Sequence, residues 1–149
     1  MWVYALDDSE YDIDSACVLT EVVKRDDIKI ALDCEHKILT EYENRLKSVR
    51  RHYQAYYKRF QTNNKFVYYS SKLAQKHLGE LEKRGFHEKE DQVFVGVAMN
   101  ADKIIVSNDG DYGIEIDENK KDALQKQKVY EYMTQEMGLK LSEVPFQLM

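Results

Sequence analysis

The chain has 149 residues, of which 43% are hydrophobic and 33% charged, with a formal net charge of −5. These values predict a single globular domain spanning residues 1–149 and exclude a disordered or Pro/Gly-rich chain. No apolar run approaches the roughly 20 residues of a membrane span, and the N-terminus lacks the basic segment of a signal peptide. We therefore expect a cytoplasmic protein, with Cys17 and Cys34 as reduced thiols in or beside the core.

Strand-like and helix-like patterns alternate along the chain. In order, the predicted elements are a strand at 2–7, a helix capped by Asp14-Ser15, a strand at 28–32, one long or two consecutive helices at 37–61, helices at 66–84 and 88–100, a strand at 104–106, a helix at 120–137 and an edge strand at 139–141. The strands are short, apolar and rich in β-branched residues, whereas the helices repeat apolar residues every three or four positions. Asn63-Asn64, Gly85 and Gly138 supply the breaks.

This alternation is typical of an α/β fold. Strands separated by helices form a parallel sheet that is covered on both faces, with right-handed crossovers. We therefore expect a small parallel sheet flanked by helices on both faces.

Four carboxylates lie where such a sheet would gather them. Asp7 and Asp109 directly follow short apolar runs, while Glu41 and Asp91 lie on predicted helices. Side chains at the carboxyl ends of parallel strands converge on one crevice. Carboxylates without His or Cys nearby suit a hard cation such as Mg²⁺ or Mn²⁺, which indicates phosphodiester chemistry.

Each carboxylate also has a simpler interpretation. Asp109 lies in an Asn-Asp-Gly-Asp stretch typical of a polar turn. Asp91 fits the first turn of a helix, where the dipole favours an acid. Glu41 fits a solvated helix face, and Asp7 fits a turn that starts a helix. Only the joint pattern favours a shared site.

That joint pattern resembles the PIN domain, a small α/β nuclease family. The resemblance rests on four segments that span most of the chain: Asp7-Asp8-Ser9 after a hydrophobic strand, Ile38-Leu39-Thr40-Glu41-Tyr42, Asp91-Gln92-Val93-Phe94-Val95-Gly96-Val97-Ala98, and Ile104-Ile105-Val106-Ser107-Asn108-Asp109-Gly110-Asp111-Tyr112. The last two segments are the more specific. Ser107 stands where the family usually has Thr, and either Asp7 or Asp8 could be the first acid.

The resemblance implies a PIN-like three-layer sandwich and a site of one or two Mg²⁺ or Mn²⁺ ions. Its ligands would be Asp7, Glu41, Asp91, Asp109 and Asp111, supported by Ser9 and Ser107. Close carboxylates need a cation between them to remain ionised together. Two such ions could activate water and stabilise the leaving oxygen of an in-line displacement.

A basic, aromatic segment occupies the middle of the chain. Residues 44–79 contain no Asp or Glu, although acids outnumber bases in the chain as a whole. Cations bind phosphates, and exposed aromatic rings stack on unpaired bases. We expect phosphate contacts from Arg50, Arg51, Lys58 and Arg59. About half of the aromatic residues between Tyr53 and Tyr69 are expected in the core instead.

The sequence therefore predicts a metal-dependent endonuclease that hydrolyses single-stranded or structured RNA, RNA being favoured over DNA, either a toxin-like or an RNA-processing enzyme. The alternative is a catalytically degenerate PIN-like module that binds RNA or a protein without cutting. A third hypothesis is a purely structural domain. An inhibitory or regulatory protein partner and a homodimer would both be compatible with the resemblance, whereas a membrane partner is not expected.

Overall fold

The computed structural model of the protein describes residues 2–7, 13–107, 112 and 121–142. Within these ranges the side chains of 2–7, 13–16, 18 and 45–54 lie outside the description. The elements in chain order are β1 (Trp2–Asp7), α1 (Ile13–Lys24), β2 (Ile28–Asp33), α2 (Lys37–Thr62), β3 (Phe66–Tyr69), α3 (Gln75–Lys83), α4 (Lys89–Asn100), β4 (Ile104–Ser107), α5 (Ala123–Glu131), the π-helical turn η2 (Tyr132–Glu136) and β5 (Lys140–Ser142).

The strands form one parallel sheet in the order β3-β2-β1-β4-β5. β1 lies at its centre, paired with β2 on one side and β4 on the other. The chain therefore builds outward from β1 to β3, crosses back, and builds outward again from β4 to β5. The α/β class predicted from the sequence is confirmed.

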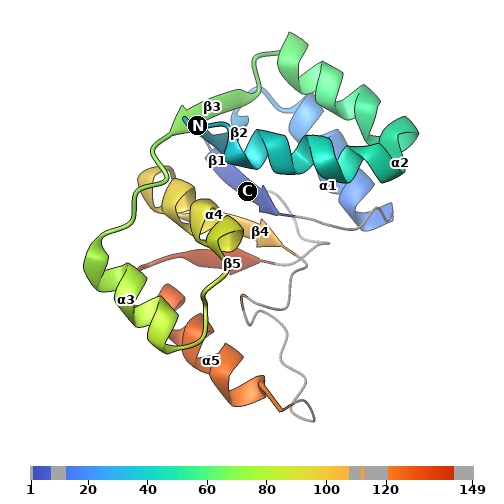
Figure 1. Cartoon of the computed structure of the whole chain (residues 1–149). Coiled ribbons are helices and arrows are strands. Elements are labelled where there is room, and N and C mark those ends of the chain that lie inside the picture. The colour runs from blue at the N-terminus through green and yellow to red at the C-terminus, as the bar shows by residue number, and fades with distance from the viewer. Residues whose placement is uncertain (1, 8–12, 108–111, 113–120, 143–149) are drawn as a thin grey trace.

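Helices lie on both sides of this sheet. Figure 1 shows α1 and α2 on one side, and α3, α4 and α5 on the other. α4 packs against the three strands β1, β2 and β4, and α2 packs against α1 and β2. α2 changes direction along its length in Figure 1, so its second half returns toward β3.

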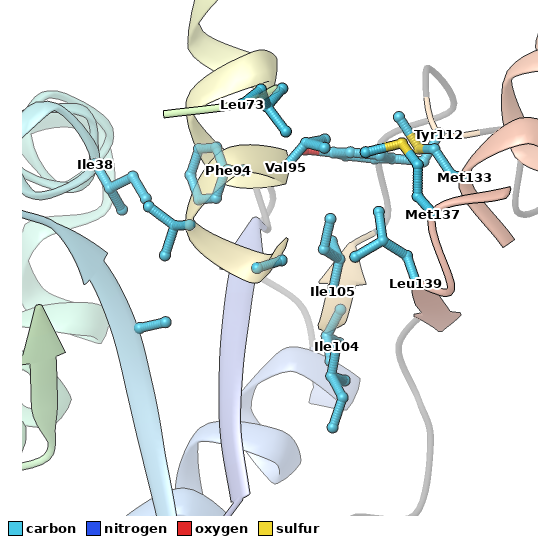
Figure 2. Close-up of a cluster of buried hydrophobic side chains, with 14 of the residues drawn as sticks. Ile38, Leu73, Phe94, Val95, Ile104, Ile105, Tyr112, Met133, Met137 and Leu139 are labelled. Carbon is cyan, nitrogen blue, oxygen red and sulfur yellow. The ribbon is translucent and has the colours of Figure 1, made fainter. Parts of the chain in front are cut away.

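The core follows from this arrangement. The central strands β1, β2 and β4 are short and mostly apolar, as expected for strands in the middle of a sheet that is covered on both faces. β2 buries Ile28, Ile30 and Leu32 completely or nearly so, and β4 buries all four of its residues. In Figure 2, Ile38 of α2 points toward Phe94 of α4, while further along the sheet a second group gathers around Met133, Met137 and Tyr112.

One predicted element is wrong. Residues 66–84 were expected to form a single helix, but Phe66–Tyr69 form strand β3 and only Gln75–Lys83 are helical. The Phe-Val-Tyr-Tyr sequence has high β-propensity, and pairing with β2 decides its conformation. The breaks at Asn64 and Gly85 are confirmed, because both residues have positive φ.

Three smaller expectations also need correction. Cys17 and Cys34 are free, as expected, but both are exposed rather than buried. Asp14 and Ser15 lie inside the first turn of α1 instead of capping it. The predicted 120–137 helix is described from Ala123 and changes to π geometry at Tyr132. None of the described helices is both long and apolar enough to cross a membrane.

Candidate active site

The centre of the sheet holds the topological switch point. From β1 the chain continues to one side of the sheet, and from β4 it continues to the other. In open parallel sheets of this kind, ligands bind in the crevice outside the carboxyl ends of the strands where the order reverses. Here that place is the paired ends of β1 and β4.

The last paired positions of these two strands are Asp7 and Ser107. Adjacent strands lie about 4.8 Å apart, so the register brings these two backbone positions together. Ser107 is 1% exposed, which makes it one of four buried polar or charged residues in the described part of the chain. The side chain of Asp7 lies outside the description, as do Ser9, Asp109 and Asp111.

Asp91 lies in the first turn of α4 and is 9% exposed. The helix dipole favours an acid at this position, as the simpler interpretation of the sequence held. However, Asp91 also lines a cavity of about 180 Å³. A small ligand bound in this cavity could therefore contact Asp91.

That cavity lies between the start of α4 and helix α5. Its charged and titratable lining comprises Arg84, His87, Glu88, Asp91, Asp122 and Lys126. Lys126 Nζ is 3.3 Å from Asp122 Oδ2, and Arg84 donates to the carbonyl oxygen of Lys128 at 2.9 Å. Typical small-molecule sites measure about 300–1,000 Å³, so this cavity is the size of a small polar group rather than a nucleoside.

Glu41 is brought toward the same end of the sheet by α2. It lies just over one turn into the helix and is half-buried. The next residue, Tyr42, packs its ring against Phe94 at a centroid distance of 6.3 Å. Phe94 follows Asp91 by one turn of α4. The two acids therefore lie on helix segments that touch each other.

The end of the last motif is also anchored here. Tyr112, which follows Asp111 in sequence, is completely buried and packs against Phe86 at 5.6 Å. Phe86 lines the same cavity as Asp91. The chain that leaves β4 at Ser107 has thus reached the Asp91 region by residue 112.

Sequence reasoning missed one acid at this edge. Asp33 ends β2, is completely buried, and accepts hydrogen bonds from the backbone N–H groups of Lys37 and Ile38 at 2.9 and 2.8 Å. Both of its oxygens thus hold the start of α2. The signal was present, because Asp33 follows an apolar strand just as Asp7 does.

The structure describes only some of the residues that we expected to bind a metal ion. Across the part of the chain that is described, no group of three or more His, Cys, Asp or Glu residues could hold a metal ion. The side chains of three of the five expected ligands, Asp7, Asp109 and Asp111, lie outside that part. The two that are described, Glu41 and Asp91, are carboxylates, the donor type that Mg²⁺ and Mn²⁺ prefer.

The four residues expected to contact phosphates all lie on α2. Arg50 and Arg51 lie in its middle, with side chains outside the description, and Lys58 and Arg59 are exposed near its end. The aromatic residues divide as expected: Phe60 is buried, Tyr56 is half-buried with its hydroxyl 3.2 Å from Thr20 Oγ1, and Tyr68 is 45% exposed.

Comparison of the chain with protein family models, curated proteins and solved structures finds no match. The residues of the chain itself therefore carry every inference about its function.

Proposed function

We propose that the protein is a metal-dependent endonuclease with a PIN-like three-layer fold that hydrolyses RNA. The observation that carries the proposal is the register of Asp7 with Ser107 at the switch point of the sheet. The sequence places an acid at the end of β1 and, two residues beyond β4, a second acid at Asp109. Asp7 thus ends a strand that borders the crevice, and we propose that Asp109, which lies outside the described residues, contributes to the same site.

The two helix-borne acids add independent support. Asp91 is largely buried, lines a cavity, and lies on the helix that packs across β1, β2 and β4. Glu41 lies beside Tyr42, which contacts that helix through Phe94. A carboxylate that lines a cavity is accessible to a ligand such as a metal ion.

The donor set fits a hard divalent cation. Asp7, Glu41, Asp91, Asp109 and Asp111 would hold it, and Ser107 would orient a carboxylate or a water molecule. When bound, such an ion supplies charge stabilisation at the phosphate and lowers the pKa of water. The carboxylates of the chain would bind and position the ion.

The substrate would be gripped by cations of α2. Arg50, Arg51, Lys58 and Arg59 belong to the 44–79 stretch that contains no acid. Each phosphate contact contributes to the salt dependence of binding, about 0.7 in log–log slope for a single strand. Replacing Arg50 and Arg51 with Gln should weaken binding to all RNA sequences and flatten that slope, while the affinity for Mn²⁺ stays the same.

The test is Mn²⁺-dependent cleavage of a labelled single-stranded RNA. We expect Asp91→Asn to lower the cleavage rate at least about 100-fold, the scale of removing a preorganised electrostatic group. Glu90→Gln is the matched control, because Glu90 is an exposed acid in the same turn and should cut like the wild type. Undiminished cleavage by Asp91→Asn would exclude Asp91 as a ligand. If the wild type binds RNA but does not cleave it, the protein is an RNA-binding module and not an enzyme.

A further inference from the structure

The outer end of the carboxyl edge carries an exposed aromatic pair. Tyr68 of β3 and His36, which precedes α2, pack edge to face with ring centroids 5.5 Å apart and an interplanar angle of 75°. Tyr68 is one of only two large hydrophobic residues that the described ranges leave exposed, the other being Leu124. An edge-to-face pair keeps a ring face open to a further planar group.

The pair ends a longer run of aromatic residues, which we term the aromatic row: Phe60, Phe66, Tyr57, Tyr68 and His36. Phe66 contacts Phe60 at 6.0 Å and Tyr57 at 5.9 Å. Tyr68 lies two positions after Phe66 in β3 and therefore on the same face of the strand. Burial, then the charges of Glu43 and Tyr68, raise the pKa of Tyr57.

Exposure increases along the aromatic row toward the carboxyl edge. Phe60 is 6% exposed, Phe66 and Tyr57 are half-buried, and Tyr68 reaches 45%. The inner residues therefore complete the core, whereas the outer pair contributes little to it. A core role explains the first three rings but leaves Tyr68 and His36 without one.

The backbone conformation at His36 is also unusual. Its φ of 62° is left-handed, a region that glycine adopts freely and that other residues adopt uncommonly. The turn is held by the hydrogen bond from His36 N–H to the carbonyl oxygen of Asp33 and by the two bonds that Asp33 accepts from α2. A glycine would adopt this left-handed conformation with less strain than His36.

The position of the Tyr68–His36 pair and the charges near it indicate what kind of ligand the pair would bind. Tyr69 and Asp33 are paired in register, and β3 lies two strands from β1, about 10 Å at the usual strand spacing. Lys37 and Lys58 are exposed neighbours in sequence of His36 and Tyr57. The contact of 3.1 Å between Lys37 and Glu35 joins two side chains that are at least 60% exposed, so a phosphate can replace the carboxylate at little cost.

From these observations we infer that Tyr68 and His36 form a base-stacking platform for single-stranded RNA, about two strand widths from the β1/β4 crevice. The inference rests on the proposed function for its choice of ligand. Bases of any identity stack on an aromatic ring, so the platform holds unpaired nucleotides without selecting a sequence. It would keep the strand extended across the carboxyl edge, whereas a duplex hides its base faces.

The test measures binding in EDTA, where no cleavage occurs, by fluorescence anisotropy of a labelled oligouridine of about eight nucleotides. We expect Tyr68→Ala to weaken binding about 5- to 100-fold, the range for loss of one stacked base. Tyr68→Phe keeps the ring and should bind like the wild type. Leu124→Ala removes the other exposed apolar side chain, which lies on α5, and should also bind like the wild type.

His36→Gly separates binding from stability. Glycine accepts the left-handed turn, so the melting temperature should match or exceed that of the wild type while the affinity for oligouridine falls. Undiminished affinity in both Tyr68→Ala and His36→Gly would overturn the inference, as would a wild type that binds no single strand or that binds a protein partner through this pair instead. If the wild type binds oligouridine through Tyr68 but does not cleave RNA with Mn²⁺, the proposed function is wrong and the stacking platform still holds.

Discussion

Asp33 and Asp91 are both buried acids at the start of a helix, but only Asp91 lines the cavity described above. Asp33 is fully enclosed, and both of its oxygens accept N–H groups from the first turn of α2. Asp91 is 9% exposed and opens onto a cavity. The first acid belongs to the framework of the fold, whereas the second is the one to which we assign a ligand role in the proposed function. Burial alone therefore does not distinguish a structural acid from a functional one.

The largest expected effect on stability comes from Asp33. Asp33→Ala leaves the N–H groups of Lys37 and Ile38 without their acceptor, and Ile38 is itself buried. Losing a charged cap and two hydrogen bonds should lower the free energy of unfolding by about 3 kcal/mol. Urea denaturation measures this loss. Glu35→Ala is the control: its exposed ion pair with Lys37 should contribute less than about 1 kcal/mol.

Mn²⁺ should reveal the opposite behaviour of Asp91. A ligand that binds only the folded state stabilises it by about 2.7 kcal/mol at a concentration 100 times its dissociation constant. We expect Mn²⁺ to raise the melting temperature of the wild type and of Glu90→Gln, but not of Asp91→Asn. Without metal, Asp91→Asn should melt no lower than the wild type, because carboxylate repulsion is relieved. If Mn²⁺ stabilises Asp91→Asn as much as the wild type, Asp91 has no more ligand character than Asp33.

Two helical glycines test how firmly α4 holds Asp91. A Cβ at Gly96 would lie 1.9 Å from the backbone oxygen of Ser71, whereas a Cβ at Gly79 of α3 would meet nothing within 4 Å. Gly96→Ala should therefore cost about 1–3 kcal/mol or more by forcing α4 away from residues 70–72, and should also slow cleavage. Gly79→Ala should stabilise by roughly 0.5–1 kcal/mol. Equal effects in thermal melts would show that α4 is free to shift.

The smallest expected effect concerns Tyr132, beside the cavity residue Arg84. Burial, then Glu80 and Glu136, raise the pKa of Tyr132 against the lowering effect of Arg84. Its hydroxyl lies 2.8 Å from His77 Nδ1, a hydrogen bond that contributes about 1 kcal/mol. Because the raised pKa keeps the folded state protonated longer than the unfolded state, this stabilisation is complete below about pH 10 and is lost as the pH rises further.

Tyr132→Phe should therefore be less stable than the wild type at pH 8, and the difference should shrink above about pH 10. Burial also raises the pKa of Tyr69, while burial lowers that of Lys65, which acts in the opposite direction. Comparing the variant with the wild type at each pH cancels these shared contributions. A difference that stays constant from pH 8 to 11 would contradict the role of the hydroxyl.

The sequence predicted those parts of the fold that local pattern decides. Strands β1, β2 and β4 are short apolar runs, and α2 repeats apolar residues at helical spacing, so both kinds were recognised. β3 was missed because the apolar residues from Val67 to Leu81 also fit a helical period. What makes Phe66–Tyr69 a strand is pairing with β2, more than 30 residues earlier, and such a partner leaves no local mark.

The site was less accessible to sequence reasoning for a related reason. Asp7, Asp33 and Asp109 each follow an apolar run, and nothing local shows that Asp33 would turn back to cap α2. Likewise, the sequence marks Tyr68 as one of several tyrosines, and only the packing of β3 at the sheet edge exposes it while Phe60 is buried. The residue type at each position can be read from the sequence, whereas the exposure of its side chain depends on how the whole chain packs.

The pairing of β1 with β4 also has a consequence for folding during synthesis. Tyr4 pairs with Ile104, so about a hundred residues must be synthesised before the crevice can exist, whereas β1, β2 and β3 can pair much earlier. Contacts so distant in sequence form slowly, since the intervening loop must first be closed. On the ribosome, the first half of the sheet can assemble while the strand that borders the site has yet to emerge. Any activity at this edge therefore requires that β4 has been synthesised and has paired with β1.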